Sequence, residues 1–232
     1  MSLDWYDIDI SDAIYTYPAR LFVQYCYDPK YNPNFDVSNH YCSYFSRDPE
    51  TGVIVDAYEI NRNIGSVATS GVDLNLDWRF DLGAGQLGVS WLATWLGSYV
   101  WQGQPGVEGQ QWRNTGCCPT LPEWKWNVDT WYRIGGLTAD LVWAYVGHFN
   151  GYFPDGDFQV PARNYLNLTT GYSFDTGSLA GLTLRVGVTN LTNEEPPIFP
   201  RYAEANTDPS VYDVLGRRYF VSVRYAFGQG PQ

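Results

Sequence analysis

The chain has 232 residues, a formal net charge of −11, 17% aromatic residues, 23 Gly, 14 Pro and only one Met. This composition favours strands and turns over helices, and the negative charge disfavours binding to nucleic acid or to anionic lipid surfaces. No run of eighteen apolar residues is present, so the sequence offers no helical membrane span.

The amino-terminal part is predicted to form one strand followed by one long loop. Residues 2–14 have strand character, and 15–65 form the loop, with a short helix near 19–27 and a strand near 53–60. The first residues have neither the basic region nor the apolar stretch of a signal peptide. We therefore expect either a mature chain with a replaced start or a piece of a longer protein.

From Gly71 onward, seven segments alternate between apolar and polar residues. In the first of them, Val72, Leu74 and Leu76 share one face, whereas Asp73 and Asp77 lie on the other. Throughout the seven segments every Asp, Glu, Lys and Arg lies on the face opposite the apolar one. Because a Lys or Arg at the bilayer midplane costs about 2–4 kcal/mol, lipid imposes this segregation on a barrel. The segments are 71–82, 86–101, 123–134, 137–149, 163–174, 182–189 and 218–227.

The connections between these segments alternate in length. Short turns lie at 83–85, 135–136 and 175–181, whereas long polar connections lie at 102–122, 150–162 and 190–217. Outer-membrane barrels have short periplasmic turns and long extracellular loops, which places 15–65 among the extracellular loops. The sequence thus predicts an all-β fold, a portion of an antiparallel up-and-down transmembrane β-barrel with about eight strands.

Several motifs carry a family resemblance. They run, in chain order, over 4–10, 42–52, 69–80, 187–198 (Gly-Val-Thr-Asn-Leu-Thr-Asn-Glu-Glu-Pro-Pro-Ile) and 218–227. In this order and spacing the chain resembles the carboxy-terminal portion of the barrel of TonB-dependent outer-membrane receptors. The resemblance implies a whole barrel of about 22 strands with a plugged lumen, of which residues 1–232 would supply about eight. The plug domain, the TonB box and the earlier strands would lie outside this chain.

The resemblance implies a function in the outer membrane of a Gram-negative bacterium. The expected activity is TonB-dependent active uptake of a scarce solute such as a siderophore, a vitamin or an oligosaccharide, with no enzymatic step. The expected partners are the remainder of the receptor, the TonB complex, the lipid bilayer and a small solute ligand, and nucleic acid is not expected. Two alternatives are an independent eight-stranded outer-membrane barrel with an adhesion or structural role, and a soluble carbohydrate-binding β-sandwich.

No pattern for covalent chemistry is found in the sequence. His40 and His148 are far apart without ligand spacing, and neither a nucleophile elbow nor a phosphate-binding or dinucleotide-binding glycine loop is present. We therefore expect no catalytic residue, no metal and no cofactor. The carboxylates at 73, 77 and 81 suggest either an acidic lumen patch or, as we favour, structural pairing with Arg79 and neighbouring basic residues.

The four cysteines are Cys26, Cys42, Cys117 and Cys118. Disulfides are expected in a chain that faces the cell exterior, and of the three connectivities one pairs adjacent residues, whose Cα atoms are closer than disulfide geometry ordinarily allows. The family resemblance places Cys26 and Cys42 in one extracellular loop and so implies a bond between them. Cys117 and Cys118 would then be a strained pair or two free thiols.

Aromatic residues and arginines in or beside the long connections are the candidate ligand-binding residues, because such side chains anchor ligands and partners well. Loop packing is the equally weighted alternative. The candidates are Trp112, Arg113, Tyr152, Arg163, Arg201 and Tyr202.

Overall fold

The computed structural model describes residues 1–17, 19–102, 110–111, 115–116, 120–151, 158–198 and 206–227. The chain divides into two compact units, which are described separately. The sheet unit comprises 1–7, 69–99 and 111–232, and the loop unit comprises 8–68 and 100–110. None of the helices in the described residues is long and apolar enough to cross a membrane.

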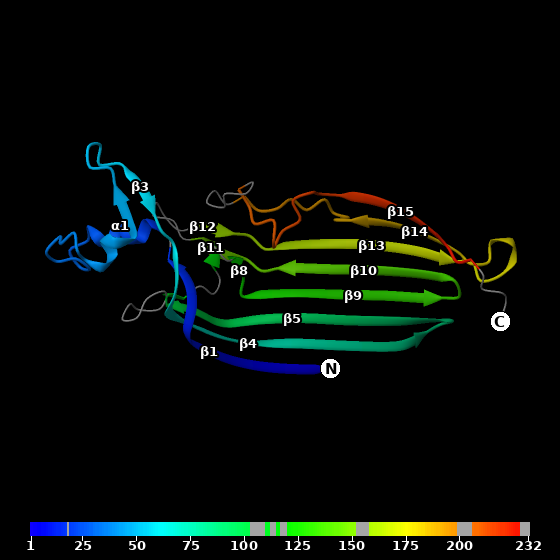
Figure 1. Ribbon diagram of the computed structural model, residues 1–232. Helices are drawn as coiled ribbons and strands as arrows, with labels where there is room; N and C mark the ends of the chain where they lie inside the picture. Colours follow the sequence, from blue (N-terminus) through cyan, green and yellow to red (C-terminus); the bar gives the residue numbers. More distant parts are fainter. Residues whose placement is uncertain are drawn as a thin grey trace. The chain divides into compact units, whose positions relative to one another are not determined.

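One large antiparallel sheet dominates the sheet unit (Figure 1), and its strands follow one another in chain order. The all-β meander predicted from the alternation is confirmed. The strands, in spatial order, are β1 (Ser2–Tyr17), β4 (Ile60–Leu82), β5 (Gly85–Gln102), β9 (Trp124–Ile134), β10 (Leu137–Val146), β13 (Arg163–Ser173), β14 (Leu182–Thr189) and β15 (Arg218–Tyr225). In the described residues β1 and β15 stand at the two ends of this order, so the sheet is open.

The remaining elements are short. Within the sheet unit, a small sheet is formed by β12 (Phe158–Val160), β11 (Phe149–Gly151), β7 (Thr115–Gly116) and β8 (Thr120–Leu121). The two-residue strand β6 (Gln110–Gln111) pairs with β5, and the 3₁₀ helix η2 (Gly177–Leu179) lies between β13 and β14.

The cross-strand register keeps the two faces of the sheet separate. On the apolar face one transverse row runs across six strands, Val89, Thr130, Leu141, Leu168, Val188 and Tyr219. On the polar face another row runs Gln86, Arg133, Thr138, Gly171, Arg185 and Ser222. The apolar face is exposed, with Val186 52% and Val221 75% accessible. An exposed apolar face of this extent is typical of contact with lipid.

Aromatic side chains gather at both ends of the apolar face. Near the long connections Trp126 stacks on Tyr145 with ring centroids 3.7 Å apart, and Trp95 lies beside Trp124 at 6.3 Å. Near the short turns the pairs are Trp78 with Phe80, Tyr172 with Phe174, and Tyr225 with Phe227. Two aromatic belts with an aliphatic band between them are the pattern of a barrel that crosses a bilayer.

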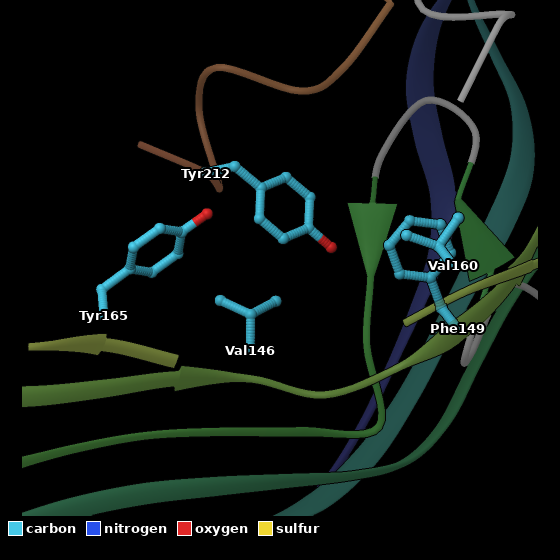
Figure 2. Close-up of a cluster of buried hydrophobic side chains, with 5 residues drawn as sticks. All are labelled: Val146, Phe149, Val160, Tyr165 and Tyr212. Carbon is cyan, nitrogen blue, oxygen red and sulfur yellow. The ribbon is translucent and has the colours of Figure 1, made fainter. Parts of the chain in front are cut away.

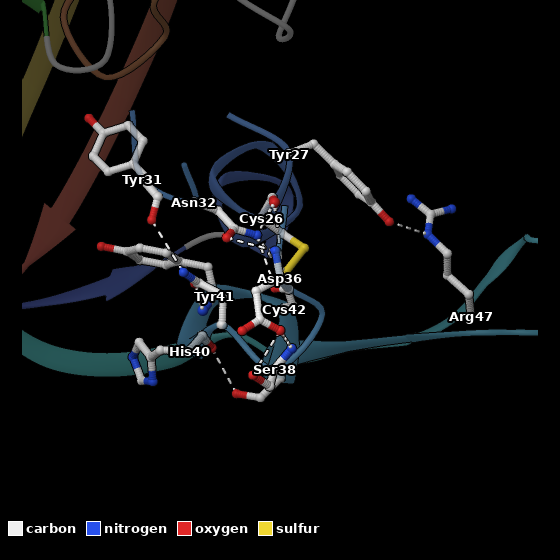
Figure 3. The surroundings of a disulfide bond; sticks show 12 residues. Cys26, Tyr27, Tyr31, Asn32, Asp36, Ser38, His40, Tyr41, Cys42 and Arg47 are labelled. Carbon is white, nitrogen blue, oxygen red and sulfur yellow. Dashed lines mark hydrogen bonds between the residues drawn. A yellow bond between two sulfur atoms is a disulfide. The ribbon is translucent and has the colours of Figure 1, made fainter. Parts of the chain in front are cut away.

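The loop unit is organised around a disulfide (Figure 3). It contains α1 (Ala19–Cys26), the 3₁₀ helix η1 (His40–Tyr44) and a hairpin of β2 (Phe45–Arg47) and β3 (Ile54–Ala57). Cys26 at the end of α1 is bonded to Cys42 in η1, with an S–S distance of 2.06 Å, which is the pairing that the family resemblance implies. Phe22 is buried and stacks on Tyr44 with ring centroids 4.2 Å apart.

Asn32 holds the segment between the two cysteines. Its buried side chain donates hydrogen bonds to the carbonyls of Cys26, at 2.8 Å, and Asp36, at 3.0 Å, and accepts one from the Asp36 N–H. The N–H and hydroxyl of Ser38 donate to the Asp36 carboxylate and hold its pKa below the ordinary value. The disulfide and these bonds together fix the fold of this segment.

Several predicted boundaries differ from the structure, most of them by one to three residues. The connection expected at 15–65 is shorter, because β1 continues to Tyr17 and β4 already begins at Ile60. The final strand ends at Tyr225 rather than at 227. Both strands continue beyond the hydrophobic alternation, and in that part the Thr16 hydroxyl of β1 donates a hydrogen bond to Asn61 Oδ1 of β4.

A charge placed on the apolar face should destabilise the protein far more than the same charge on the polar face. Leu168, the middle residue of β13, faces the apolar side, and its neighbour Thr169 faces the polar side. Leu168→Lys should therefore lower the free energy of unfolding in lipid vesicles by about 2–4 kcal/mol, and Thr169→Lys by less than about 1 kcal/mol. Urea titration followed by tryptophan fluorescence measures both, and equal losses would contradict the assignment of the two faces.

Candidate functional site

The polar face of β13 carries three consecutive inward side chains at its long-connection end, Arg163, Tyr165 and Asn167. Arg163 pairs across the strands with Val146, and Tyr165 with Ala144. Alternation along the strand gives all three the same face. We call these three residues the rim row.

A buried cluster covers part of the rim row (Figure 2). Val146, Phe149, Val160, Tyr165 and Tyr212 pack together and are at most 7% exposed. Tyr212 belongs to the connection between β14 and β15, so this connection folds back over the polar face of β10 and β13. Burial raises the pKa of the Tyr212 hydroxyl above its usual range, and Tyr165 adds to the effect. Tyr212 therefore stays neutral at physiological pH.

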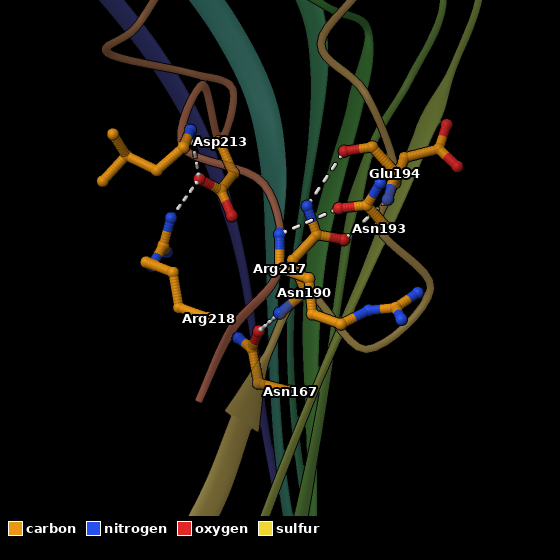
Figure 4. Close-up of polar contacts among 8 residues, drawn as sticks. Asn167, Asn190, Asn193, Glu194, Asp213, Arg217 and Arg218 are labelled. Carbon is orange, nitrogen blue, oxygen red and sulfur yellow. Dashed lines mark hydrogen bonds and ion pairs between the residues drawn. The ribbon is translucent and has the colours of Figure 1, made fainter. Parts of the chain in front are cut away.

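The start of that connection is a tight turn built by asparagines (Figure 4). Asn190 is fully buried with φ 54°, and its side chain donates to the Glu194 carbonyl at 2.9 Å and accepts from the Glu194 N–H at 2.7 Å. The Asn190 N–H donates to Asn167 Oδ1 at 2.8 Å, which ties the turn to the rim row. Asn193, with φ 55°, accepts from the Arg217 N–H at 3.0 Å. Asparagine suits these positions because it tolerates the left-handed region and bonds its own backbone.

Two ion pairs flank the turn. Arg163 Nε lies 3.4 Å from Glu194 Oε1, with both side chains partly buried, and Arg163 Nη1 donates to the Ala162 carbonyl at 3.3 Å. Arg218 Nη1 lies 2.8 Å from Asp213 Oδ1. Burial acts to raise the pKa of Asp213, but hydrogen bonds from Arg218 and the Leu215 N–H, with the Arg218 charge, hold it below its ordinary value. The Asp213 carboxylate is therefore ionised at neutral pH.

Most of the sequence-predicted ligand candidates fall outside the described residues. Arg163 is the exception. It is the first residue of β13 and forms an ion pair with Glu194, which belongs to the connection between β14 and β15. The candidates outside the described residues are Trp112, Arg113, Tyr152, Arg201 and Tyr202, together with the thiols of Cys117 and Cys118. The sequence reasoning missed Asn167, Asn190 and Tyr212. The two asparagines of Thr-Asn-Leu-Thr-Asn were a usable signal for left-handed turn positions.

The acidic row on β4 does not pair as we favoured. Asp73 accepts a hydrogen bond from the Thr94 hydroxyl at 2.7 Å, and within the described part of the chain none of Asp73, Asp77 and Asp81 forms an ion pair with Arg79. Alternate residues along a strand point the same way but are about 6.6 Å apart, which is too far for direct contact unless the side chains bend. No group of metal-binding side chains occurs among the described residues.

Comparison with known protein families identifies a family that matches most of the chain. Residues 1–191, which span β1 to β14 and the start of the asparagine turn, match the family described as "TonB dependent receptor-like, beta-barrel". No curated protein matches the chain.

The asparagine turn should depend on both its backbone angle and its side-chain bonds. Asn190→Ala removes the two bonds to Glu194 and leaves a left-handed residue with a Cβ, so we expect a loss of about 2–3 kcal/mol in the free energy of unfolding. Asn190→Gly loses the same bonds but adopts the backbone angle freely, and its loss should be about 1 kcal/mol smaller. Denaturant titration in detergent compares the two, and equal losses would show that the angle carries no strain.

Proposed function

The chain belongs to the TonB-dependent receptor-like β-barrel family, and on that premise we propose that it is the carboxy-terminal portion of a receptor for TonB-dependent active uptake of a scarce solute. Members of this family are outer-membrane receptors and transporters of Gram-negative bacteria rather than enzymes. A siderophore, a vitamin or an oligosaccharide is the proposed class of solute. The proposed location is the outer membrane.

The observation that carries the proposal is an uninterrupted eight-strand meander with an apolar, aromatic-belted outer face and two open edges. Inside a bilayer an unpaired backbone N–H or C=O costs several kcal/mol, so a spanning sheet has to be closed. In the described residues β1 and β15 are the two edge strands of the sheet, and they do not pair with each other. This supports a larger barrel in which further strands of the receptor pair with these edges.

The proposed partners follow from the same architecture. The family implies a plug domain inside the barrel and coupling to TonB. Lipid contacts the apolar face, and the solute contacts the long connections and the rim. We propose that Arg163 takes part in ligand binding together with residues of those connections, namely Trp112, Arg113, Tyr152, Arg201 and Tyr202.

Neither alternative gains support from a specific observation. An independent eight-stranded barrel requires β1 to pair with β15, and its interior would be filled by side chains without room for a solute. A soluble sandwich requires a second sheet to cover the apolar face, whereas the two smaller sheets of the described residues are made of strands of two to four residues.

A chimeric receptor tests the proposal. We expect that replacing the matching carboxy-terminal strands of a characterised family member by residues 1–232 gives a receptor that inserts in the outer membrane and supports growth on its solute. Growth should be lost in cells that lack TonB, because energy for uptake comes from the TonB complex. Cells that express residues 1–232 alone serve as the matched control. Uptake by that chain alone, or growth of the chimera without TonB, would contradict the proposal.

A further inference from the structure

Aromatic side chains on the apolar face are densest over three neighbouring strands, β5, β9 and β10. They gather at the long-connection end of these strands and form a group of rings that we call the tryptophan platform. Its members are Trp95, Trp124, Trp126, Trp143 and Tyr145. On the next strand, β13, the platform ends at Asn164, which lies opposite Tyr145 on the same face.

The register of the strands joins these rings into one surface. Trp124 lies opposite Trp95, and Trp126 lies opposite Tyr145. The ring of Trp126 stacks on Tyr145 and meets the ring of Trp143 edge to face, with centroids 5.7 Å apart. Because Trp124 is 46% and Trp143 37% exposed, a ligand can reach the platform from outside the sheet.

Small residues let the ring of Trp95 lie close to its own strand. A Cβ at Gly97 would lie 3.1 Å from two carbons of the Trp95 ring, so that ring lies over Gly97. Ala93, which lies opposite Trp126 on the same face, is only 4% exposed, so larger side chains cover it. A ring that lies over its strand presents its face, rather than its edge, to the surroundings.

Two indole N–H groups of the platform are bonded within the protein. Trp95 Nε1 donates to Glu123 Oε1 and Trp143 Nε1 donates to Asn164 Oδ1, both at 2.9 Å. Tryptophans of an interfacial belt ordinarily direct this N–H to lipid headgroups. Here the two bonds fix the orientation of the rings instead. The exposed carboxamide of Asn164 stands beside them with its own N–H donors.

No basic side chain accompanies the platform on the three strands that carry it. β5 and β10 contain neither Lys nor Arg, and the two basic residues of β9, Lys125 and Arg133, lie on the polar face. The carboxylate of Glu123 adds a negative charge beside Trp95. A phosphate group would therefore meet a carboxylate here rather than a cation, which disfavours the headgroup of an anionic phospholipid.

We propose that the tryptophan platform binds the uncharged sugar ring of a membrane glycolipid, whose acyl chains lie along the apolar face beside it. A hexose has C–H groups on its ring faces, which stack on aromatic rings, and hydroxyl groups at its rim, which bond to carboxamides. The platform lies where the apolar band meets the long connections, which is the level of lipid headgroups. The inference requires that the apolar face contacts lipid, and it does not depend on transport.

Lipid binding to residues 1–232 in an uncharged detergent tests the proposal. The probes are monoglucosyl diacylglycerol, phosphatidylcholine and phosphatidylglycerol with the same acyl chains, and native mass spectrometry measures the affinity of each bound lipid. We expect a single glucosyl lipid to bind about tenfold more tightly than either phospholipid. Trp124→Leu with Trp126→Leu should abolish this preference, because leucine keeps the surface apolar but removes the rings.

Matched variants separate the platform from general contact with lipid. Tyr172→Leu with Tyr225→Leu removes two rings at the short-turn end of the same face and should leave the preference unchanged. Trp124→Phe with Trp126→Phe keeps a ring at both positions and should retain the preference within about threefold. Circular dichroism checks that each variant is folded.

Three results would overturn the proposal. The first is equal affinity of the wild-type chain for the glucosyl lipid and phosphatidylcholine, or tighter binding of phosphatidylglycerol. The second is an unchanged preference in the leucine variant. The third is methyl glucoside that binds as tightly as the glucosyl lipid, because the occupant would then be a soluble sugar rather than a lipid.

Discussion

The register of the antiparallel ladder is the constraint on which the rest of the structure depends. A strand alternates its side chains with a period of two, so a slip by one residue moves every side chain to the other face. In this sheet such a slip would turn Arg185 and Arg224 toward lipid and Val221 inward. Because an arginine in the middle of the apolar band costs about 2–4 kcal/mol, lipid itself selects the observed pairing.

The polar face reinforces this register through aromatic rings that lie over glycines. Trp131 lies against Gly88 on β5, and Phe220 lies against Gly187 on β14, each so closely that a Cβ on the glycine would clash with the ring. A neighbouring register would bring a residue with a side chain beneath the ring. At Gly171 the absence of a side chain lets the stem of Arg185 lie over β13. Register and packing on the polar face therefore depend on a few glycines.

The strands could be predicted from the sequence because lipid enforces a simple periodic rule on them. The predicted segment 182–189 matches β14 without error, and 163–174 differs from β13 by one residue. Outside the lipid that rule does not apply. The last residues of β1 and the first residues of β4 were missed, because polar residues such as Asn61 can continue a strand as well as end it. Asn167 and Asn190 were missed because their bond joins residues 23 positions apart, and no local pattern reports such a contact.

The long connection between β14 and β15 links the membrane sheet to the proposed ligand side. Asn190 anchors its start to β13, Tyr212 packs its later part against Tyr165, and Asp213 pairs with Arg218 at its end. These three contacts hold the described parts of the connection, 190–198 and 206–217, against the sheet. Within the rim row, Tyr165 and Asn167 make the contacts that position this connection.

The orientation of the two faces can be tested most directly with brominated lipids, which quench tryptophan fluorescence on contact. Trp91 lies on the apolar face opposite Val128, whereas Trp131 lies on the polar face opposite Gly88. In a reconstituted sample Trp91→Phe should reduce the quenchable fraction of the emission, because it removes a lipid-facing ring. Trp131→Phe should remove only emission that brominated lipid does not quench. The intensity lost on quenching should therefore stay the same as in the wild-type chain. Loss of quenching in the Trp131 variant, or no quenching of the wild-type chain, would contradict the account.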